Sequence, residues 1–433
     1  MTTEALYKLF LQSKGVCTDS RAVEPGTIFF ALKGENFDGN AFAFKALESG
    51  AKYAVVDDKS LPADERLIVS ENTLLTLQEL ALYHREQLGI PVLGLTGTNG
   101  KTTTKELITA VLATEYNVIS TKGNLNNHIG VPLTLLSMNS ATQIGVVEMG
   151  ASAPGEIAAL VSIVKPDCGL ITNVGKAHLL GFGSLEGVKK TKGELYDYLS
   201  NNGGTVLLNA DNPVLCEMID EREPVSCICY GVNYEKMKVH KSSPEKPFLS
   251  VGLNTGEIIT TKLIGSYNAD NIAAALCAGN FFNIDRAHAI TAIEQYHPSN
   301  NRSMLVRGKD NLLIVDAYNA NPVSMMAALE NFRDMEKGPL ALVIGDMLEL
   351  GKDSQNEHKI ILDYIAGMGI DTLLFVGKEF ASAAEGNPLF AKAKFFPDSL
   401  KLREFLEQNP LSGRSVLIKG SRGTRLERVI DIL

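Results

Sequence analysis

Short continuous apolar runs alternate, along most of this chain, with stretches in which apolar residues recur at helical spacing. From Pro91 onward the apolar runs are PVLGL, NVIS, IGVVEM, GLITNV and TVLLN, with helix-compatible stretches between most of them. Short apolar runs are typical of buried strands, and the spaced pattern is typical of amphipathic helices. The alternation therefore predicts βαβ units and a mainly parallel sheet.

The same alternation resumes near His297 and Pro298, with the runs NLLIVD, LALVIGD, TLLFVG and SVLIKG. It predicts a second, smaller doubly wound sheet of the Rossmann-like type. The stretch YHPSNNR between the two predicted sheets has the Pro, Asn and Ser content of a linker. Between about Lys238 and Ile264, FLSVGL and EIITTKLIG flank NTG and predict an antiparallel addition, after which NADNIAAALCAGNFF predicts a helix.

The first block has shorter runs, TIFFAL and YAVVD, and glycine-rich turns such as KGENFDGN. LLTLQELALYHREQL then predicts an amphipathic helix that leads out of it. A length of 433 residues favours about three domains. We expect an α/β protein with a small α/β domain at 1–88, a central P-loop-like domain with a mostly parallel sheet at 89–297, and a C-terminal doubly wound domain at 298–433.

Charge and composition exclude several classes of protein. The formal net charge is -9, and an acidic chain is a poor non-specific binder of nucleic acids or anionic membranes. No pair among the six cysteines has CxxC spacing, which argues against a zinc site and favours buried thiols in a reducing compartment. No apolar run approaches the ~18 residues of a membrane span, and MTTEALYKLFLQSKG does not have the apolar core of a signal peptide. We expect a cytoplasmic protein.

The stretch TGTNGKTTT, from Thr96 to Thr104, follows the predicted strand PVLGL and precedes the predicted helix KELITAVLATEY. It departs from the usual P-loop pattern, because Leu95 stands where the first glycine of that pattern is expected. Even so, loop amides at a helix N-terminus can point toward an anion, a lysine adds a positive charge, and a threonine hydroxyl can bind Mg²⁺. The alternative is a glycine turn capped by threonines. The candidate phosphate-binding residues are Thr96, Gly97, Thr98, Asn99, Gly100, Lys101, Thr102 and Thr103.

Two further candidates follow predicted strands. Glu148 ends the run IGVVEM, and His178 follows GLITNV in NVGKAHL. Both would lie on the rim where open α/β sheets bind ligands, and a carboxylate and an imidazole there can complete a Mg²⁺ site around phosphates. Taken singly, Glu148 could also be a solvated strand end and His178 a helix cap.

TGTNGKTTT is followed in order by EMGAS, TNVGKAHL, KGE, LNADN, GSYNADNIAAAL, DAYNANPVSM and GDMLELG. In order and spacing, along essentially the whole chain, these stretches resemble the Mur ligase family. TDSRAVEPGTIFFALKGENFDGNAFAFKALESGA is similar to the uridine-nucleotide domain of that family, a block that folylpolyglutamate synthase does not share. The shortened loop is normal in this family, so the resemblance implies a phosphate cradle.

The resemblance implies an ATP-dependent amide ligase that phosphorylates a carboxylate and lets an amine attack the acyl phosphate, releasing ADP and phosphate. GNLNNHIGVPLTLL, DAYNANPVSM, GDMLELG and VLIKGSRG are most similar to members that join D-alanyl-D-alanine to UDP-N-acetylmuramoyl-tripeptide in peptidoglycan precursor synthesis. ATP and Mg²⁺ are the implied cofactors, and a monomer is the implied state. Two alternatives stay open: another amide ligase of the family, acting on a shorter muramoyl peptide or a folate, and a non-catalytic ATP-binding switch.

Site residues also follow from the resemblance. It implies an adenine-side role for Asn268 and Asn271, a γ-phosphate contact for Arg302 and a ribose contact for Asp316, the last two acting when the third domain closes. Helix capping is the structural alternative for the two asparagines. The amine-substrate candidates are Asn319, Asn321 and Ser324, for which an Asx-turn is the alternative.

The remaining candidates bind the nucleotide substrate or the metal. Ser20 and Arg21 are the uridine-nucleotide candidates, with an exposed turn as the alternative. The muramoyl-peptide candidates, which could equally form a polar loop, are Asn124, Asn126 and Asn127. Lys192 in KGE aligns with the lysine that the family carbamylates, which would join Thr102, Glu148 and His178 as a metal ligand. Without the resemblance, Lys192 would be assigned to a solvated helix face beside Lys189 and Lys190.

Overall fold

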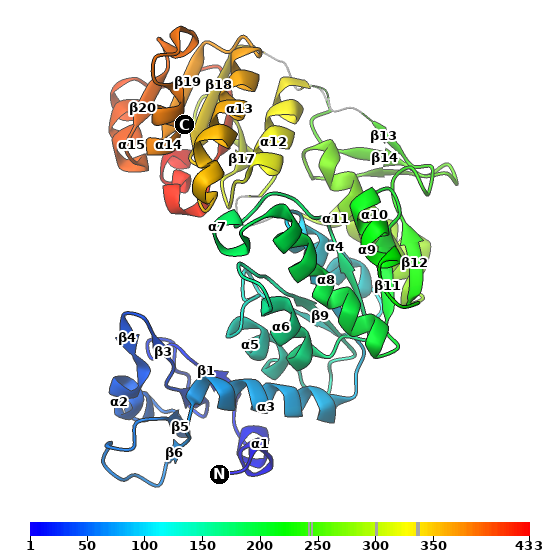
Figure 1. The fold of residues 1–433 in the computed structure, drawn as a ribbon, viewed down its shortest axis with the longest axis vertical. Helices are drawn as coiled ribbons and strands as arrows, with labels where there is room; N and C mark the ends of the chain where they lie inside the picture. The colour runs from blue at the N-terminus through cyan, green and yellow to red at the C-terminus, as the bar shows by residue number, and fades with distance from the viewer. Residues whose placement is uncertain (241–242, 244–245, 299–301, 335–337) are drawn as a thin grey trace.

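A computed structural model describes residues 1–240, 243, 246–298, 302–334 and 338–433. Figure 1 shows three successive α/β units along the chain, from the blue N-terminal unit through the green centre to the orange and red C-terminal unit. The expected α/β class with mostly parallel sheets is confirmed. Residues 299–301 of the expected linker YHPSNNR lie outside the described residues. In the described part of the chain, no helix has both the length and the apolar character needed to cross a bilayer.

The N-terminal unit, from Thr3 to Leu88, is built on four parallel strands in the order β1-β2-β5-β6. Their bounds are β1 (Val16–Cys17), β2 (Ile28–Phe30), β5 (Tyr53–Val56) and β6 (Leu67–Val69). The other elements are α1 (Thr3–Leu11), the hairpin β3 (Lys33–Gly34) and β4 (Phe37–Asp38), the 3₁₀ helix η1 (Gly39–Phe42), α2 (Ala43–Glu48) and α3 (Thr73–Leu88).

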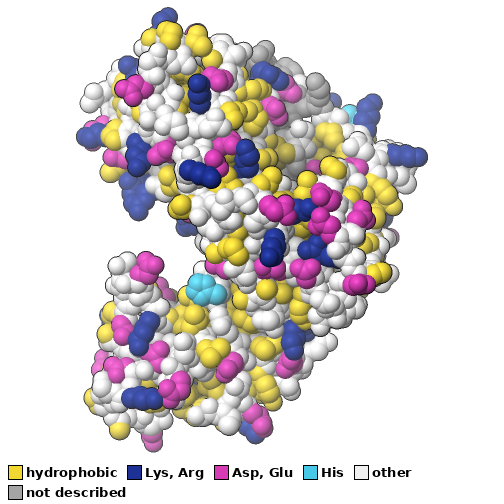
Figure 2. Space-filling model, in the orientation of Figure 1, with side chains coloured by type: hydrophobic (Ala, Val, Ile, Leu, Met, Phe, Trp, Pro, Cys, Tyr) yellow, Lys and Arg dark blue, Asp and Glu magenta, His cyan; other side chains and the backbone are white. Residues whose placement is uncertain are grey.

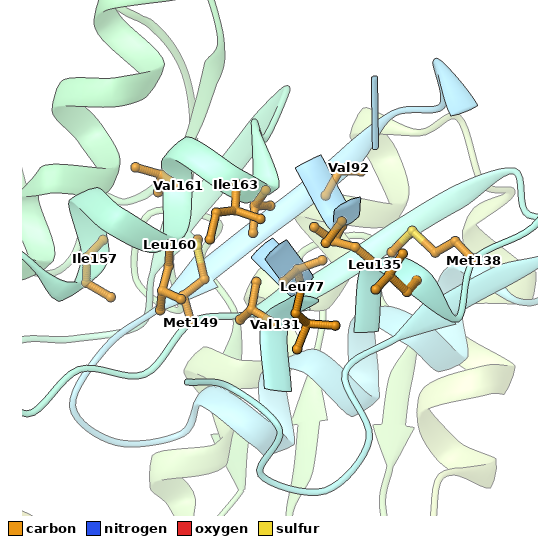
Figure 3. Close-up of a cluster of buried hydrophobic side chains, with 14 of the residues drawn as sticks. Leu77, Val92, Val131, Leu135, Met138, Met149, Ile157, Leu160, Val161 and Ile163 are labelled. Atoms are coloured by element: carbon orange, nitrogen blue, oxygen red, sulfur yellow. The ribbon is translucent and has the colours of Figure 1, made fainter. Parts of the chain in front are cut away.

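Helix α3 attaches this unit to the next one. It begins where the Asn72 side chain accepts a hydrogen bond from the Leu75 amide at 2.9 Å, and it ends at Gly89, whose φ of 60° suits a glycine C-cap. Figure 3 shows Leu77 of α3 packed among apolar side chains of the central unit, including Leu135 and Leu160. Because Leu77 and Leu135 are fully buried, each contributes roughly 1.5–3 kcal/mol of burial to this junction.

The central unit contains six parallel strands in the order β12-β11-β10-β7-β9-β8. The strands are β7 (Val92–Thr96), β8 (Val118–Ser120), β9 (Ile144–Glu148), β10 (Cys168–Ile171), β11 (Thr205–Asn209) and β12 (Ser226–Tyr230). The helices are α4 (Lys101–Leu112), α5 (Gly130–Leu136), α6 (Glu156–Val164), α7 (Leu179–Phe182), α8 (Leu185–Asn201), α9 (Pro213–Asp220), η2 (Ser266–Asn268), α10 (Ala269–Phe281) and α11 (Arg286–Gln295).

Both faces of this sheet are covered, as the apolar runs predict. In β7, Val92 packs into the cluster with α3, α5, α6 and α8, whereas Leu93 and Leu95 pack into the opposite cluster with α4, α10 and α11. The expected antiparallel addition is also confirmed, as β13 (Lys238–His240), β14 (Ser250–Gly252) and β15 (Ile258–Thr260). Covering both faces leaves the carboxyl ends of the strands as the open rim.

The C-terminal unit, from Arg302 to Leu433, holds six strands in the order β16-β17-β21-β18-β19-β20, of which only β16 runs antiparallel. The strands are β16 (Met304–Arg307), β17 (Leu312–Asp316), β18 (Leu340–Gly345), β19 (Thr372–Val376), β20 (Lys394–Phe396) and β21 (Ser415–Lys419). The helices are α12 (Pro322–Asp334), η3 (Gly351–Asp353), α13 (Ser354–Ala366), α14 (Lys378–Ala384), η4 (Pro388–Phe390), α15 (Ser399–Gln408), η5 (Arg422–Thr424) and η6 (Leu426–Ile432).

Candidate active site

The loop between β7 and α4 has a conformation that requires its two glycines. Gly97 has φ 148° and Gly100 has φ 79°, both in the region that L side chains rarely adopt. A Cβ on Gly97 would lie 1.9 Å from Oγ1 of Thr172, and one on Gly100 would lie 2.7 Å from Oδ1 of Asn271. The glycines therefore permit both the turn and the close approach of neighbouring elements.

The segment after β10 holds this loop in place. Oγ1 of Thr172 and Nδ2 of Asn173 donate to the carbonyl of Asn99 at 2.6 and 3.1 Å, and the Asn99 amide donates to Oδ1 of Asn173 at 2.9 Å. The sequence patterns predicted no role for Thr172 or Asn173, although these two residues begin the stretch TNVGKAHL. Their contribution is to fix the loop backbone before any ligand arrives.

Lys101 is the first residue of α4, and its ammonium group folds back over the loop. Nζ donates to the carbonyls of Gly97 at 2.7 Å and Thr98 at 3.1 Å. Burial lowers the pKa of Lys101, the Arg302 guanidinium lowers it further, and the Glu148 carboxylate opposes them. Backbone carbonyls are weak partners for an ammonium group compared with a phosphate, so the lysine is available to a bound anion.

Glu148 lies at the end of β9 and is only 1% exposed. Its two carboxylate oxygens accept hydrogen bonds from Oγ1 of Thr102 at 2.9 Å and from Nδ2 of Asn126 at 2.8 Å. A buried carboxylate held by a hydroxyl and an amide has a fixed direction. The arrangement brings together three predicted residues from β9, α4 and the segment after β8.

The charge of Lys101 acts on both His178 and Lys192. His178 precedes α7 with φ 51°, its Nδ1 contacts Glu349 of the C-terminal unit, and burial lowers its pKa. Lys192 on α8 is 3% exposed, and its Nζ lies 6.0 Å from the centre of the Phe182 ring. Burial, aided by the charge of Lys101, lowers the pKa of Lys192. The solvated-face alternative for Lys192 is therefore wrong.

Asn268 and Asn271 form a chain of buried hydrogen bonds that ends on α4. Nδ2 of Asn271 donates to Oδ1 of Asn268 at 2.8 Å, and Oγ1 of Thr104 donates to Oδ1 of Asn271 at 2.9 Å. Nδ2 of Asn268 donates to the carbonyl of Ile264 at 2.7 Å. Neither side chain caps α10, so the capping alternative does not describe them.

The C-terminal unit presents Arg302 and Asp316 to the loop. The Arg302 guanidinium stacks 3.7 Å from the ring centre of Tyr318. Asp316, at the end of β17, accepts from Nζ of Lys419 at 2.5 Å and from the Ser303 amide at 3.4 Å. Tyr318 and Lys419 were missed, although the quoted stretches DAYNANPVSM and VLIKGSRG contain them; their partners are apparent only once β17 and β21 are adjacent.

Asn319, Asn321 and Ser324 form the turn that starts α12. Oδ1 of Asn321 accepts from the Ser324 amide at 2.9 Å, and the Asn321 amide donates to Oγ of Ser324 at 3.1 Å. Nδ2 of Asn321 also reaches across to Oδ1 of Asn99 at 2.7 Å. Asn319 is exposed, and its Oδ1 accepts from the Ala320 amide. The Asx-turn alternative is therefore present, and Asn321 in addition links the C-terminal unit to Asn99.

One cavity of about 850 Å³ joins these elements and is lined by residues of all three units. In the same orientation as the ribbon, Figure 2 shows the surface hollowed where the N-terminal and C-terminal units face each other. The predicted residues that line the cavity are Thr98, Asn99, Gly100, Lys101, Thr102, Thr103, Asn124, Asn126, Asn127, Glu148, His178, Asn268, Asn271, Arg302, Asp316, Asn319, Asn321 and Ser324. Tyr267, for which the sequence predicted no role, also lines the cavity.

Five of the predicted residues are not among those that line the cavity. Thr96 ends β7, Gly97 begins the loop and Lys192 lies buried on α8, and none of the three is among the lining residues. Ser20 and Arg21 belong to the N-terminal unit and are not brought to the cavity. Arg21 is exposed and pairs with Asp19 at 2.7 Å, which lowers the pKa of Asp19 to about 2. Asn127, which does line the cavity, also caps the turn before α5, accepting from the Gly130 amide at 2.9 Å.

Thr102 and Glu148 fit a hard cation, whereas the ammonium group of Lys192 does not. Thr102 and Glu148 offer a hydroxyl and a carboxylate, the donors that Mg²⁺ prefers. In the described residues, however, no three His, Cys, Asp or Glu side chains converge on one point. Lys192 as an ammonium ion would repel a metal and, in the described part of the chain, has no carboxylate partner. The set fits Mg²⁺ only if Lys192 carries an anionic oxygen ligand.

Comparison with family models matches the chain in three consecutive segments. Residues 12–94 match the Mur ligase family catalytic domain, 95–279 match the Mur ligase middle domain, and 301–422 match the Mur ligase glutamate ligase domain. The loop between β7 and α4 and Glu148 fall in the middle segment, while Asp316 and Lys419 fall in the last.

Curated relatives and solved structures agree with these models. The chain is 37% identical to the UDP-N-acetylmuramoyl-tripeptide–D-alanyl-D-alanine ligase of Bacillus subtilis, covering 97% of this chain and 93% of the relative, and 36% identical to that of Escherichia coli, covering 96% and 93%. It resembles MurF from Acinetobacter baumannii with a TM-score of 0.86, 29% identity and 99% and 97% coverage. It also resembles the MurF ligase of Thermotoga maritima in complex with ADP, with a TM-score of 0.83 and 28% identity, covering 98% of this chain and 97% of that structure. This chain therefore belongs to the Mur ligase family.

Proposed function

We propose that this protein joins D-alanyl-D-alanine to UDP-N-acetylmuramoyl-tripeptide with ATP as the energy source, in peptidoglycan precursor synthesis. The observation that carries the proposal is the shared cavity, where the phosphate loop, the buried carboxylate Glu148 and side chains of the C-terminal unit meet. The names of the relatives support the two substrates, and the ADP complex of the Thermotoga relative supports a nucleotide at this site.

Lys101 of the loop and Arg302 of the C-terminal unit let two anions, the γ-phosphate and the substrate carboxylate, approach each other. Lys101, already positioned by the loop carbonyls, and Arg302, stacked on Tyr318, neutralise the γ-phosphate as the substrate carboxylate attacks it. The γ-phosphoryl group passes to the carboxylate, ADP leaves, and the amine of the dipeptide displaces phosphate from the acyl phosphate. Asn268 and Asn271 support the adenine side and Asp316 the ribose.

Mg²⁺ would be held by Thr102, Glu148, His178 and a carbamate on Lys192, and when bound it would supply positive charge that offsets the repulsion of the anionic reactants. Carbamate formation needs a neutral amine. The burial of Lys192 and the charge of Lys101 lower its pKa and so raise the neutral fraction. A carbamate would also convert the repelling ammonium into an anionic oxygen donor.

The three units divide the substrates among them in this proposal. Residues 1–88 hold the uridine nucleotide through Ser20 and Arg21, residues 89–297 bind ATP, and residues 298–433 close over ATP and bind the amine. Because Ser20 and Arg21 lie away from the cavity, this role requires the uridine end of a long substrate to reach them. Asn124, Asn126 and Asn127 face the muramoyl peptide, and Asn319, Asn321 and Ser324 the dipeptide. We place the ligase in the cytoplasm as a monomer.

Measuring ADP release with each substrate omitted in turn tests the function. We expect release to depend on both UDP-N-acetylmuramoyl-tripeptide and D-alanyl-D-alanine, with one amide formed per ADP. Steady ATP hydrolysis indifferent to both would favour an ATP-binding switch, and turnover with a single amino acid or a folate would favour another ligase of the family. Running the assay with lysine-containing and diaminopimelate-containing tripeptides identifies the third residue.

A further inference from the structure

Two guanidinium groups contact the ring of Tyr318. Arg302 stacks with its Cζ 3.7 Å from the ring centre, and Cζ of Arg422 lies 5.4 Å from the same centre. Nη1 of Arg422 also donates to the Tyr318 hydroxyl at 3.3 Å. The two cations come from opposite ends of the C-terminal unit and meet at one half-buried ring.

The two guanidinium groups at the Tyr318 ring carry positive charge that the described residues do not neutralise. Lys419 and Asp316 cancel each other through their 2.5 Å ion pair. Neither Arg302 nor Arg422 forms an ion pair with a carboxylate in the part of the chain that the structure describes. The positive charges of Arg302 and Arg422 at one ring repel each other, so anions that bind there stabilise the arrangement. The γ-phosphate accounts for Arg302 under the proposed function, which leaves Arg422 without an anion.

The segment that carries Arg422 is fixed to the loop that carries Tyr318. Nζ of Lys419 donates to the carbonyl of Asn319 at 3.3 Å, and Oγ of Ser421 donates to the carbonyl of Ala320 at 3.2 Å. Ser421 is 4% exposed, and its Oγ also accepts from the Leu348 amide at 2.9 Å. Arg422 is exposed at the end of this anchored segment, so its backbone is held while its guanidinium is open to a ligand.

We propose that Arg422, together with the Tyr318 hydroxyl, binds the C-terminal carboxylate of the incoming dipeptide. This assignment rests on the proposed function, because the dipeptide is the substrate that brings a carboxylate to the C-terminal unit. A guanidinium matches a carboxylate with two parallel hydrogen bonds, and Tyr318 lines the cavity beside Asn319 and Asn321. A dipeptide spans about 7 Å. Anchoring its carboxylate at Arg422 and Tyr318 sets how far its amine reaches and so selects for two residues.

The test compares D-alanyl-D-alanine with its C-terminal amide, which has no carboxylate, in wild type, Arg422→Ala and Arg422→Lys. We expect wild type to prefer the dipeptide over the amide by at least about tenfold in kcat/KM, the scale of a hydrogen bond to a charged group. In Arg422→Ala the KM for the dipeptide should rise by a similar factor and the preference should disappear, while the KM for ATP stays unchanged. Arg422→Lys should recover part of the preference.

Arg425→Ala is the matched control, because Arg425 is an exposed arginine three residues further along, and in the described part of the chain the guanidinium groups at Tyr318 are those of Arg302 and Arg422. Tyr318→Phe removes only the hydroxyl and gives an independent measurement if Arg422→Ala folds poorly. An Arg422→Ala enzyme that keeps the wild-type preference, or a wild type that accepts the amide equally well, overturns the assignment alone. Absence of any product from wild type with the dipeptide overturns the proposed function, and the assignment with it.

Discussion

Asn99, in the loop between β7 and α4, and Asn321, at the start of α12, form a reciprocal pair of side-chain amides. Nδ2 of Asn321 donates to Oδ1 of Asn99 at 2.7 Å, and Nδ2 of Asn99 donates to Oδ1 of Asn321 at 3.4 Å. Lys176 and Glu357 form a second contact between the same two units, at 2.6 Å. The C-terminal unit is therefore docked directly onto the loop that would hold the phosphates of ATP.

Asn321→Asp should disrupt this docking without losing the helix cap. Aspartate can still accept from the Ser324 amide, but it places a carboxylate against Oδ1 of Asn99 instead of a donor. We expect kcat to fall by about tenfold or more, since an unpaired polar group at a closed interface costs about 1–3 kcal/mol. The measurements are steady-state ADP release and thermal unfolding.

Asn387→Asp is the control for Asn321→Asp, because Asn387 also caps a short helix, through the Leu389 amide at 3.1 Å, and lies away from the cavity. In a double-mutant cycle, Asn99→Ala and Asn321→Ala should show a coupling energy of about 0.5–3 kcal/mol in kcat. Strict additivity would show that the pair does not act as one contact.

Lys101→Ala should abolish amide formation and leave the fold intact. Among the described residues, the hydrogen bonds of the ammonium group go to two loop carbonyls, so its loss removes little packing. The expected loss is at least about 3 kcal/mol of transition-state stabilisation, or roughly 10²-fold in kcat. Lys309→Ala, an exposed lysine of the C-terminal unit, should behave as wild type. Near-normal turnover by Lys101→Ala would contradict the phosphate-cradle assignment.

Lys192→Ala should be nearly inactive, and added acetate or formate should partly restore turnover. A small carboxylate can enter the space left by the buried side chain and supply the oxygen ligand that the carbamate would provide. Turnover is measured at increasing acetate concentration. Wild-type activity of Lys192→Ala in CO₂-depleted buffer would exclude the carbamate.

Two neighbouring lysines provide controls for this rescue. Lys190 is exposed, and Lys189 pairs with Glu217 at 3.0 Å and Glu221 at 3.1 Å. Lys190→Ala and Lys189→Ala should keep near-normal activity, and acetate should not stimulate them. Equal stimulation of all three variants would point to a general salt effect.

His84 should make the junction between the N-terminal and central units sensitive to acid. Its Nε2 donates to the Met138 carbonyl at 3.0 Å, and its Nδ1 accepts from the Tyr7 hydroxyl at 3.2 Å. Burial lowers the pKa of His84 in the folded protein. The unfolded state therefore binds more protons, and stability present above the unfolded pKa of about 6.5 is lost as the pH falls through that value toward the folded pKa.

His84→Gln keeps a donor for the Met138 carbonyl and removes the titrating group. We expect the melting temperature of this variant to fall less than that of wild type between about pH 8 and about pH 5.5. His240→Gln, on the antiparallel sheet, serves as the control for a histidine change elsewhere. An equal or larger fall in His84→Gln would show that other groups cause the acid sensitivity.

The sequence by itself determined the elements of this fold and the position of the glycine-containing loop between β7 and α4. Apolar runs such as PVLGL and IGVVEM became β7 and β9, and the spacing in LLTLQELALYHREQL became α3. These features depend on neighbouring residues, because strand and helix periods repeat over a few positions. The loop was visible for the same reason: Gly97, Gly100 and Lys101 act within a single turn.

Only the tertiary structure decided which distant residues meet. Asp316 pairs with Lys419 because β17 and β21 are adjacent in register, although 103 positions separate them in the chain. Strand order is set by packing of whole layers, and no local pattern encodes it. The burial of Lys192 likewise depends on what covers α8, whereas its neighbour Lys190 stays exposed. The pairing of Asn99 with Asn321 arises where the central and C-terminal units touch, and so only the tertiary structure reveals it.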